Sequence, residues 1–214
     1  SVKLSALYPR YELAKRADVL RILSPRLRSL ALLAKSAGMG LNVDAEEADR
    51  LGLSLAVIES VVSEPALSDW DGFGVVVQAY GPRAENAIQA LYDMAVKYDR
   101  KFMVRLAKGA YWDTEIKLAQ VQGMEHFPVF TQKAQTDVSY IANARKLLNM
   151  TDRIYPQFAT HNAHTVAAIL HMATDPASYE FQRLHGMGEA MHSMVMKDNK
   201  TRCRIYAPVG AHRD

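Results

Sequence analysis

The sequence of 214 residues is poor in cysteine and has no long apolar run. Its single cysteine, Cys203, excludes an intrachain disulfide, so no oxidising compartment is required; we expect an inert buried thiol there. No apolar stretch approaches the length of a membrane span. The first residues lack the apolar core and cleavage pattern of a signal peptide. Together these features predict an ordinary globular domain.

Clustered positive charge is also missing. The net charge is only +3, and the basic residues are spread along the chain rather than run together. No segment resembles a ribbon-helix-helix module. Both observations argue against nucleic-acid binding by this chain.

Seven short segments share one pattern, in which apolar or β-branched residues lead into a polar residue and then a turn or helix signal. They span residues 2–7, 40–47, 72–80, 102–110, 154–162, 179–186 and 203–210. Apolar residues at helical spacing predict helices between them, at 25–38, 45–62, 85–98, 136–150 and 163–173. Thr136 or Asp137 is the predicted cap of the fourth helix.

The alternation of strands and helices predicts an α/β fold with a parallel sheet. Polar residues follow nearly every strand, which favours a (βα)8 barrel of the TIM type over a doubly wound sheet. A doubly wound nucleotide fold also needs a glycine-rich turn after its first strand, and none is present. Because only seven strands are visible, and the sequence starts without Met inside a predicted strand, we expect residues 1–214 to form a single barrel domain lacking its first strand and final helix.

The stretch "VRLAKGAYWD" (104–113) carries the richest chemistry. Arg105 and Lys108 place two cations at a strand end, and Gly109 permits close backbone approach. Tyr111 and Trp112 add flat apolar surface with hydrogen-bonding tips. This combination suits an electron-rich ring or an anion, although a loop that packs on the core with its cations in solvent explains the same residues.

Histidine and carboxylate residues raise a second hypothesis, a metal-assisted hydrolase that uses His161 and Asp44. His161 and His164 are three residues apart, but only His161 ends a predicted strand. Asp44 ends another strand, where Lys3 or Arg105 is a candidate partner in a site or in a structural ion pair. A third hypothesis is a non-enzymatic regulatory or nucleic-acid-binding module.

The motifs "KLSAL", "NVDAEEADR", "VVVQAY", "VRLAKGAYWDTEIK", "YPQFATHNAHT", "YEFQRLHGMGE" and "CRIYAPVG" occur in this order along the chain. Their sequence resembles the proline dehydrogenase domain of bacterial proline utilization A flavoenzymes over essentially all 214 residues. The resemblance implies a (βα)8 barrel that holds FAD non-covalently and oxidises L-proline to Δ1-pyrroline-5-carboxylate. It also implies a quinone as electron acceptor. We expect no resident metal and no nucleic-acid binding through this domain.

The resemblance assigns catalytic roles to Lys3, Asp44 and Arg105. Lys3 pairs with the proline carboxylate, Asp44 lies beside the substrate, and Arg105 lies near the flavin N5. Substrate contacts are implied for Lys3, Asp44, Tyr111, Leu184 and Tyr206. The implied FAD-binding positions all lie at or after strand ends: Gln78, Arg105, Lys108, Gly109, Tyr111, Trp112, Thr131, Thr160, His161, Asn162, Gln182 and Leu184.

The family also has a final helix with two arginines that complete the substrate clamp, and the printed sequence ends before it. We therefore expect weak proline binding by these residues alone. An aldehyde dehydrogenase module is the expected neighbour in the full-length polypeptide. The expected location is the cytoplasm, either free or peripheral to the inner membrane.

Overall fold

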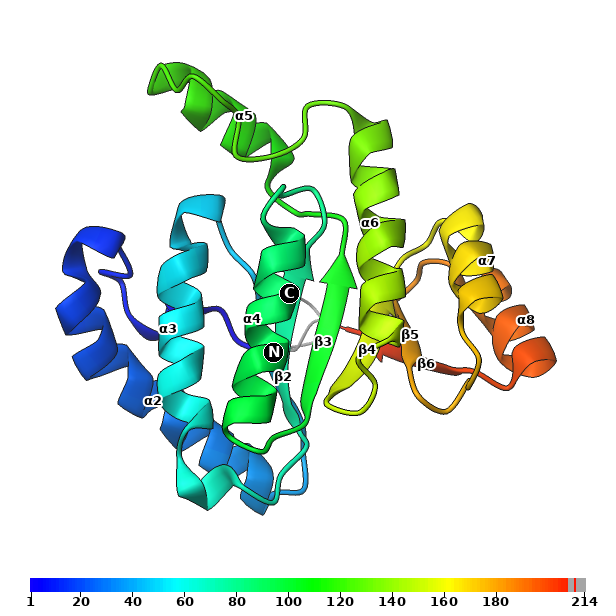
Figure 1. Ribbon diagram of the computed structural model, residues 1–214, viewed down its shortest axis with the longest axis horizontal. Coiled ribbons are helices and arrows are strands. Elements are labelled where there is room, and N and C mark those ends of the chain that lie inside the picture. Colours follow the sequence, from blue (N-terminus) through cyan, green and yellow to red (C-terminus); the bar gives the residue numbers. More distant parts are fainter. Residues whose placement is uncertain (208–209, 211–214) are drawn as a thin grey trace.

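The computed structural model describes residues 1–207 and 210, which fold around one parallel sheet (Figure 1). The six strands are β1 (Leu41–Val43), β2 (Phe73–Gln78), β3 (Phe102–Ala107), β4 (Ile154–Ala159), β5 (Glu180–Leu184) and β6 (Arg202–Tyr206). Each strand pairs in parallel with the next along the chain. A parallel sheet in strict chain order winds in one direction, so its crossover helices collect on one face and the sheet curls around the other.

Helices cover the outer face of the curled sheet (Figure 1). The long ones are α2 (Arg16–Ser36), α3 (Leu51–Val62), α4 (Ala84–Lys97), α6 (Lys133–Leu148), α7 (Ala163–Met172) and α8 (Glu189–Asn199). A short helix, α1 (Leu4–Leu7), and single 3₁₀ turns at Leu13–Lys15, Ala48–Arg50 and Pro65–Leu67 complete the layer. Helix α5 (Trp112–Val121) differs, since it projects from the body beyond the carboxyl end of β3.

Side-chain alternation along the strands separates an apolar outer face from a polar inner face. Outward residues such as Val75, Val104 and Phe158 are at most 4% exposed, and they pack in one core with the helices. The inward residues are mostly polar: Asn42, Asp44, Gln78, Arg105, Gln157, Glu180, Gln182, Arg204 and Tyr206. The outer face therefore supplies the hydrophobic stability, and the inner face is left for polar chemistry.

The segment at residues 2–7 is not the strand that its sequence predicts. Val2 alone forms a parallel bridge, to Val43, and the chain then turns into helix α1. Leu4 is 1% exposed, and Leu7 packs against the same core one helical turn later. A strand would direct these two leucines to opposite faces, so one helical turn buries more of their surface.

The other predicted strands are confirmed in position and order, with β6 ending at Tyr206. Residues 208–209 of the last predicted segment, and the place after it where a final helix is expected, lie outside the described residues. The structure thus shows a curled six-stranded sheet with one added bridge. Closure into an eight-stranded barrel stays a prediction.

Several helix predictions were wrong. Helix α2 begins at Arg16 rather than at 25, α3 begins at Leu51 rather than at 45, and neither α5 nor α8 was predicted. Helix α6 is capped by Gln132, whose backbone N–H donates to Gln135 Oε1 at 3.3 Å, because the helix begins three residues before Thr136. Thr136 is instead buried inside the helix.

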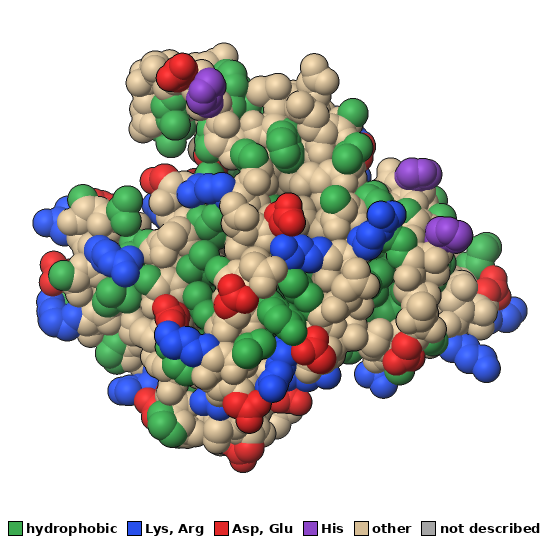
Figure 2. Space-filling model, viewed as in Figure 1, with side chains coloured by type: hydrophobic (Ala, Val, Ile, Leu, Met, Phe, Trp, Pro, Cys, Tyr) green, Lys and Arg blue, Asp and Glu red, His purple; other side chains and the backbone are tan. Residues whose placement is uncertain are grey.

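The surface has no dominant sign of charge on the helical face. Figure 2 shows Lys and Arg side chains interspersed with Asp and Glu across this view. Within the described part of the chain, no helix has both the length and the apolar character needed to cross a bilayer.

Tyr140 on α6 joins the ends of two strands and supplies a test of the packing. Its buried hydroxyl lies 3.1 Å from the carbonyl oxygen of Leu106 and 3.3 Å from that of Ala159. We expect Tyr140→Phe to lower the free energy of unfolding by about 1–2 kcal/mol, because a buried hydrogen bond is lost without a cavity. Urea unfolding of the purified protein measures the change.

Tyr92→Phe is the matched control, since its hydroxyl donates to Asp152 at 3.0 Å on the surface. It should change the free energy of unfolding by less than about 0.5 kcal/mol. Equal losses for the two variants would contradict a special role for Tyr140.

Candidate functional site

The carboxyl ends of the strands surround a cleft of about 670 Å³. Its volume lies within the range of small-molecule sites, about 300–1,000 Å³. The structure brings thirteen of the predicted site residues to its lining: Lys3, Asp44, Gln78, Arg105, Lys108, Gly109, Tyr111, Thr160, His161, Asn162, Gln182, Leu184 and Tyr206. Because they come from all six strand ends and the segment before β1, the cleft depends on the whole sheet.

An ion pair between Asp44 and Arg105 lies in the cleft wall. The Arg105 Nη2 atom is 3.4 Å from Asp44 Oδ1, and the Arg105 and Asp44 side chains are 11% and 17% exposed. The other Asp44 oxygen accepts a hydrogen bond from the Ser1 hydroxyl at 3.1 Å, and Ser1 also bonds the Tyr206 hydroxyl at 2.8 Å. This confirms Arg105 as a partner of Asp44.

Arg105 is incompletely satisfied by the protein. Its guanidinium lies 4.8 Å from the centre of the Tyr206 ring, which provides a cation–π contact. Its buried Nε has no hydrogen-bond partner among the described residues. A permanently charged group with a free buried donor in a cleft is suited to bind an electron-rich or anionic ligand.

Lys3 does not pair with Asp44, contrary to one sequence-based alternative. Its ammonium instead lies 5.6 Å from the centre of the Tyr111 ring, and Tyr111 is the main cause of a raised Lys3 pKa. The raised pKa keeps the ammonium charged at neutral pH. Lys3 and Tyr111 therefore form a second cationic and aromatic wall of the cleft.

Two loops meet at Gln78, at the end of β2. Its side-chain amide donates to the Glu46 carbonyl at 2.9 Å, and its carbonyl oxygen accepts from the Ala110 N–H at 2.9 Å. Gly109, which precedes Ala110, has φ +152°, and a Cβ at this residue would be 2.2 Å from the Tyr80 ring. Glycine is required because the backbone passes over the ring without space for a side chain.

The two remaining predicted residues, Trp112 and Thr131, lie in an adjoining pocket of about 380 Å³. This pocket shares Lys108 and Gly109 with the cleft. Trp112 donates its indole N–H to the Phe130 carbonyl at 2.8 Å, which fixes the ring beside the opening. The two pockets together can hold an elongated ligand.

Sequence analysis missed an acidic residue at this junction. Asp137 forms ion pairs with Lys108 and, at 2.6 Å, with Lys133, and the hydrogen bonds from these lysines lower its pKa. Two cations sharing one carboxylate leave a net positive charge at the entrance to the adjoining pocket. Asp137 was interpreted only as a helix cap, because its partner Lys108 lies on a different segment.

The β4 end supplies three successive site residues with distinct contacts. Thr160 accepts at its hydroxyl from the Asn162 N–H at 3.1 Å, and Asn162 caps α7 by accepting from the Thr165 N–H at 2.9 Å. His161 Nε2 accepts from the Leu184 N–H at 2.9 Å, so a neutral His161 carries its proton on Nδ1. The Thr160 carbonyl contacts buried His192, whose pKa is lowered by burial.

A polar floor under the cleft was also missed. It consists of the inward residues Asn42, Gln157, Glu180, Gln182 and Arg204, of which only Gln182 had been predicted for the site. The available signal was a glutamate inside a buried strand, in "YEFQRL". The partners of this glutamate lie on three strands, so they could not be identified from the sequence alone.

The metal-hydrolase hypothesis gains no support from this geometry. Across residues 1–207 and 210, no three His, Cys, Asp or Glu side chains converge as metal ligands. Within the cleft, His161 uses Nε2 for Leu184, and Asp44 is paired with Arg105.

The loop after β1 is anchored to α5 by a buried carboxyl group. Glu115 is 3% exposed and accepts the Ala48 N–H at 2.6 Å. Burial raises the Glu115 pKa, Asp49 and Glu47 add to that rise, and the Ala48 N–H opposes it. The side chain thus connects the projecting helix to the loop that follows Asp44.

The chain is an α/β protein with a singly wound parallel sheet. Its polar residues gather at the carboxyl ends of the strands, which is where barrel enzymes have their active sites. A sequence model of the family described as Proline dehydrogenase matches residues 1–214, and the chain belongs to that family. The Bifunctional protein PutA of Salmonella typhimurium is 54% identical over 99% of this chain and 17% of its own length.

Two solved structures agree with this family assignment. A crystallised mutant of Bradyrhizobium japonicum Proline Utilization A (PutA) is 55% identical, with a TM-score of 0.96 over 99% of this chain and 22% of that one. PutA from Bdellovibrio bacteriovorus, inactivated by N-propargylglycine, is 36% identical, with a TM-score of 0.92 over the same shares. The chain thus spans about a fifth of the length of these relatives.

Gly109→Ala tests the close approach of the cleft wall to Tyr80. We expect a loss of roughly 1–3 kcal/mol in the free energy of unfolding, from the clash and the positive φ. Thermal unfolding measures it. Gly52→Ala on α3 is the control, because its Cβ would meet nothing within 4 Å; this variant should be unchanged or more stable by up to about 1 kcal/mol. A stable Gly109→Ala protein would show that the wall can move.

Glu115→Gln tests the buried carboxyl group through pH. A raised folded-state pKa means that folding takes up a proton between the ordinary carboxyl pKa and the raised one. The wild-type free energy of unfolding should therefore fall as pH rises through that interval. Glutamine keeps an acceptor for Ala48 but does not titrate, so Glu115→Gln should lose this fall.

Urea unfolding at a series of pH values from acid to neutral measures this difference. Glu125→Gln is the control, because the Glu125 side chain is 89% exposed. This variant should retain the wild-type pH dependence of the free energy of unfolding. Parallel curves for wild type and Glu115→Gln would contradict the assignment.

Proposed function

We propose that the protein is an FAD-dependent proline dehydrogenase, which oxidises L-proline to Δ1-pyrroline-5-carboxylate and passes the electrons to a membrane quinone. The observation that carries this proposal is the Arg105 guanidinium in the cleft wall, whose buried Nε has no hydrogen-bond partner among the described residues. The Lys3 ammonium and the rings of Tyr111 and Tyr206 line the same cleft. Membership of the proline dehydrogenase family supports it.

The residues present fit a non-covalently bound FAD. Arg105, whose Nε has no partner in the described part of the chain, suits the negative charge that a flavin ring gains on reduction, and the cationic Lys108 and Lys133 suit the phosphates. Trp112 and Thr131 line the adjoining pocket, which can take the rest of an elongated cofactor. The remaining predicted FAD residues share the cleft lining: Gln78, Gly109, Tyr111, Thr160, His161, Asn162, Gln182 and Leu184. When bound, FAD would accept the hydride that leaves the proline Cδ.

Substrate binding is assigned to Lys3, Tyr111, Leu184 and Tyr206 of the cleft lining. The Lys3 ammonium would hold the proline carboxylate, and the Tyr111 and Tyr206 rings would limit the orientation of the pyrrolidine ring. Leu184, 45% exposed at the end of β5, supplies apolar surface. Fixing both ends of a small substrate reduces the entropy that the reaction must lose.

Asp44 and Arg105 are the groups nearest to the developing charges. Arg105 cannot lose its charge, and it stabilises negative charge that forms in the cleft. The proline nitrogen must be unprotonated for hydride to leave the adjacent carbon, and Asp44 can accept or orient the departing N–H proton. Charge is conserved because one hydride leaves carbon and one proton leaves nitrogen.

The wider setting of the chain is inferred from its longer relatives. They are named bifunctional, and this chain covers only 17% of the Salmonella typhimurium protein. We infer that residues 1–214 form one proline dehydrogenase domain, completed into a barrel by flanking sequence and joined to an aldehyde dehydrogenase module. A cytoplasmic location, free or at the inner membrane surface, would give access to the quinone.

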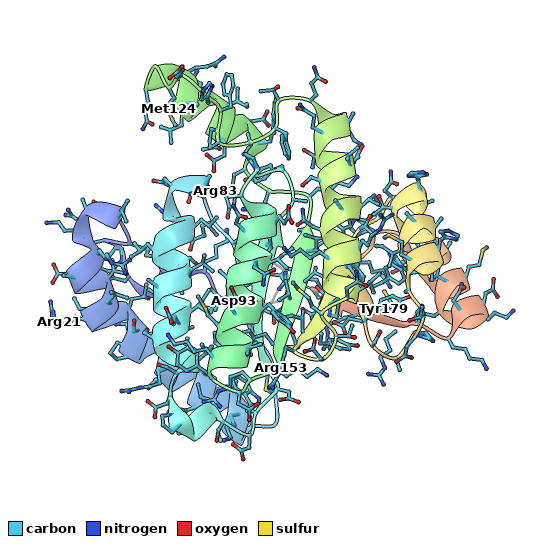
Figure 3. All side chains as sticks on the ribbon, in the orientation of Figure 1. Arg21, Arg83, Asp93, Met124, Arg153 and Tyr179 are labelled. Carbon is cyan, nitrogen blue, oxygen red and sulfur yellow. The ribbon has the colours of Figure 1, made fainter. Side chains whose placement is uncertain are left out.

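Anaerobic spectroscopy tests cofactor and reaction together. We expect the full-length protein loaded with FAD to lose its visible flavin absorbance when L-proline is added. Arg105→Met should lower kcat/KM for proline about 10²–10³-fold, because a preorganised charge at the reacting centre is removed. Arg153→Met is the control: Arg153, labelled in Figure 3, precedes β4, pairs with Asp99 and is not part of the cleft lining, so its loss should leave kcat/KM unchanged. A colourless protein with one bound zinc would instead favour a hydrolase.

A further inference from the structure

The carboxylate of Glu180 organises the polar floor beneath the cleft. Glu180 is 3% exposed, although it carries an ionisable group. Its Oε1 accepts from Arg204 Nε at 2.6 Å, and from Gln157 Nε2 and Gln182 Nε2 at 2.9 Å each. Its Oε2 accepts from Arg204 Nη2 at 2.9 Å. Four donors therefore converge on one buried carboxylate from three strands.

This convergence fixes the direction of two side-chain amides. An ionised carboxylate offers only acceptors, so Gln157 and Gln182 must both turn their NH2 groups toward Glu180. Their carbonyl oxygens then point away from it. The direction follows from chemistry rather than from the choice between nitrogen and oxygen positions.

The two amides differ in what lies on their other side. The Gln157 carbonyl accepts from Asn42 Nδ2 at 3.1 Å, so this amide is held from both ends inside the floor. Gln182 lines the cleft, and in the described residues no donor contacts its Oε1. The Gln182 Oε1 atom is therefore an available acceptor for a ligand in the cleft. The contact between Gln182 Nε2 and Glu180 orients the amide so that this oxygen, and not the NH2 group, is available.

We propose that Glu180 is a positioning residue for cofactor binding. It holds Gln182 so that Oε1 faces the bound cofactor and accepts a hydrogen bond from an N–H of its ring. Arg204 in turn holds Glu180 through a two-pronged contact, and its side chain is 61% exposed. This inference rests on the proposed function, since it takes FAD as the occupant of the cleft.

Glu180→Gln separates this role from simple support of the fold. Glutamine at 180 keeps the volume but offers one acceptor and one new NH2, which itself needs an acceptor. Turning the Gln157 amide would also require Asn42 to turn, because the Gln157 carbonyl accepts from Asn42 Nδ2, so Gln182 is the amide that can turn its oxygen toward the floor alone. Its NH2 would then face the cleft and repel a ring N–H.

The expected result is that Glu180→Gln weakens FAD binding about tenfold, the equivalent of one hydrogen bond lost at the ligand. Loss of a buried negative charge would by itself tighten the binding of an anionic cofactor. Weaker binding therefore indicates amide orientation rather than charge. FAD fluorescence titration of the full-length apoprotein measures the affinity, and thermal unfolding is recorded beside it.

A double-mutant cycle with Gln182→Met provides the decisive comparison. If Glu180 acts through Gln182, Glu180→Gln should have no further effect on FAD affinity in the Gln182→Met protein. Gln157→Met removes another amide from the same carboxylate but away from the cleft lining. It should lower the unfolding temperature while changing FAD affinity less than about twofold, because the two effects are separable.

The outcomes divide cleanly. Wild-type protein that does not bind FAD would overturn the proposed function, and this inference with it. Wild-type protein that binds FAD, with unchanged affinity in Glu180→Gln, would overturn this inference alone. Additive losses in the double mutant would do the same, since they would show that Glu180 acts through the fold and not through Gln182.

Discussion

The inner face of a curled parallel sheet has to be filled by the sheet's own side chains, because no helix fits inside it. In this protein the alternation of the strands sends valine, leucine and phenylalanine outward to the helices and polar residues inward. Each inward charge must then find a partner from another strand. This need for partners explains both the floor and the cleft. In the floor the charged groups have more of their hydrogen-bonding groups paired than in the cleft.

Two carboxylate–guanidinium pairs on the inner face show this difference. Glu180 and Arg204 make two short contacts, and two amides complete the carboxylate. Asp44 and Arg105 approach only to 3.4 Å, and the Arg105 Nε has no partner within residues 1–207 and 210. A buried pair adds little net stability, but removing one member is costly. The closed pair is therefore suited to hold geometry, whereas the open pair can accept a ligand without losing a satisfied contact.

The sequence predicted most strands and the residues at their carboxyl ends, because both are encoded by local patterns. The resemblance of "KGAYWD" and "QFATHNAHT" to a known family supplied the roles. Contacts between segments far apart in the chain could not be predicted from local patterns. Examples are the contacts of Glu180 with Arg204 and of Lys108 with Asp137, which only the folded structure shows. Helix α5 was not predicted; it projects from the body, and its buried residues are Glu115 and Ala119 (Figure 1).

The mouth of the cleft is built differently from its floor. Gln78 joins the loops after β1 and β3 through two backbone groups, and Glu115 joins α5 to the first of these loops. These are single side-chain bonds between loops, whereas the floor is a network of shared donors. Met124, labelled in Figure 3 at the outer end of the projection, is 51% exposed. The rim therefore fixes the loops to one another, whereas the floor beneath holds the buried acceptors and charges of the inner face.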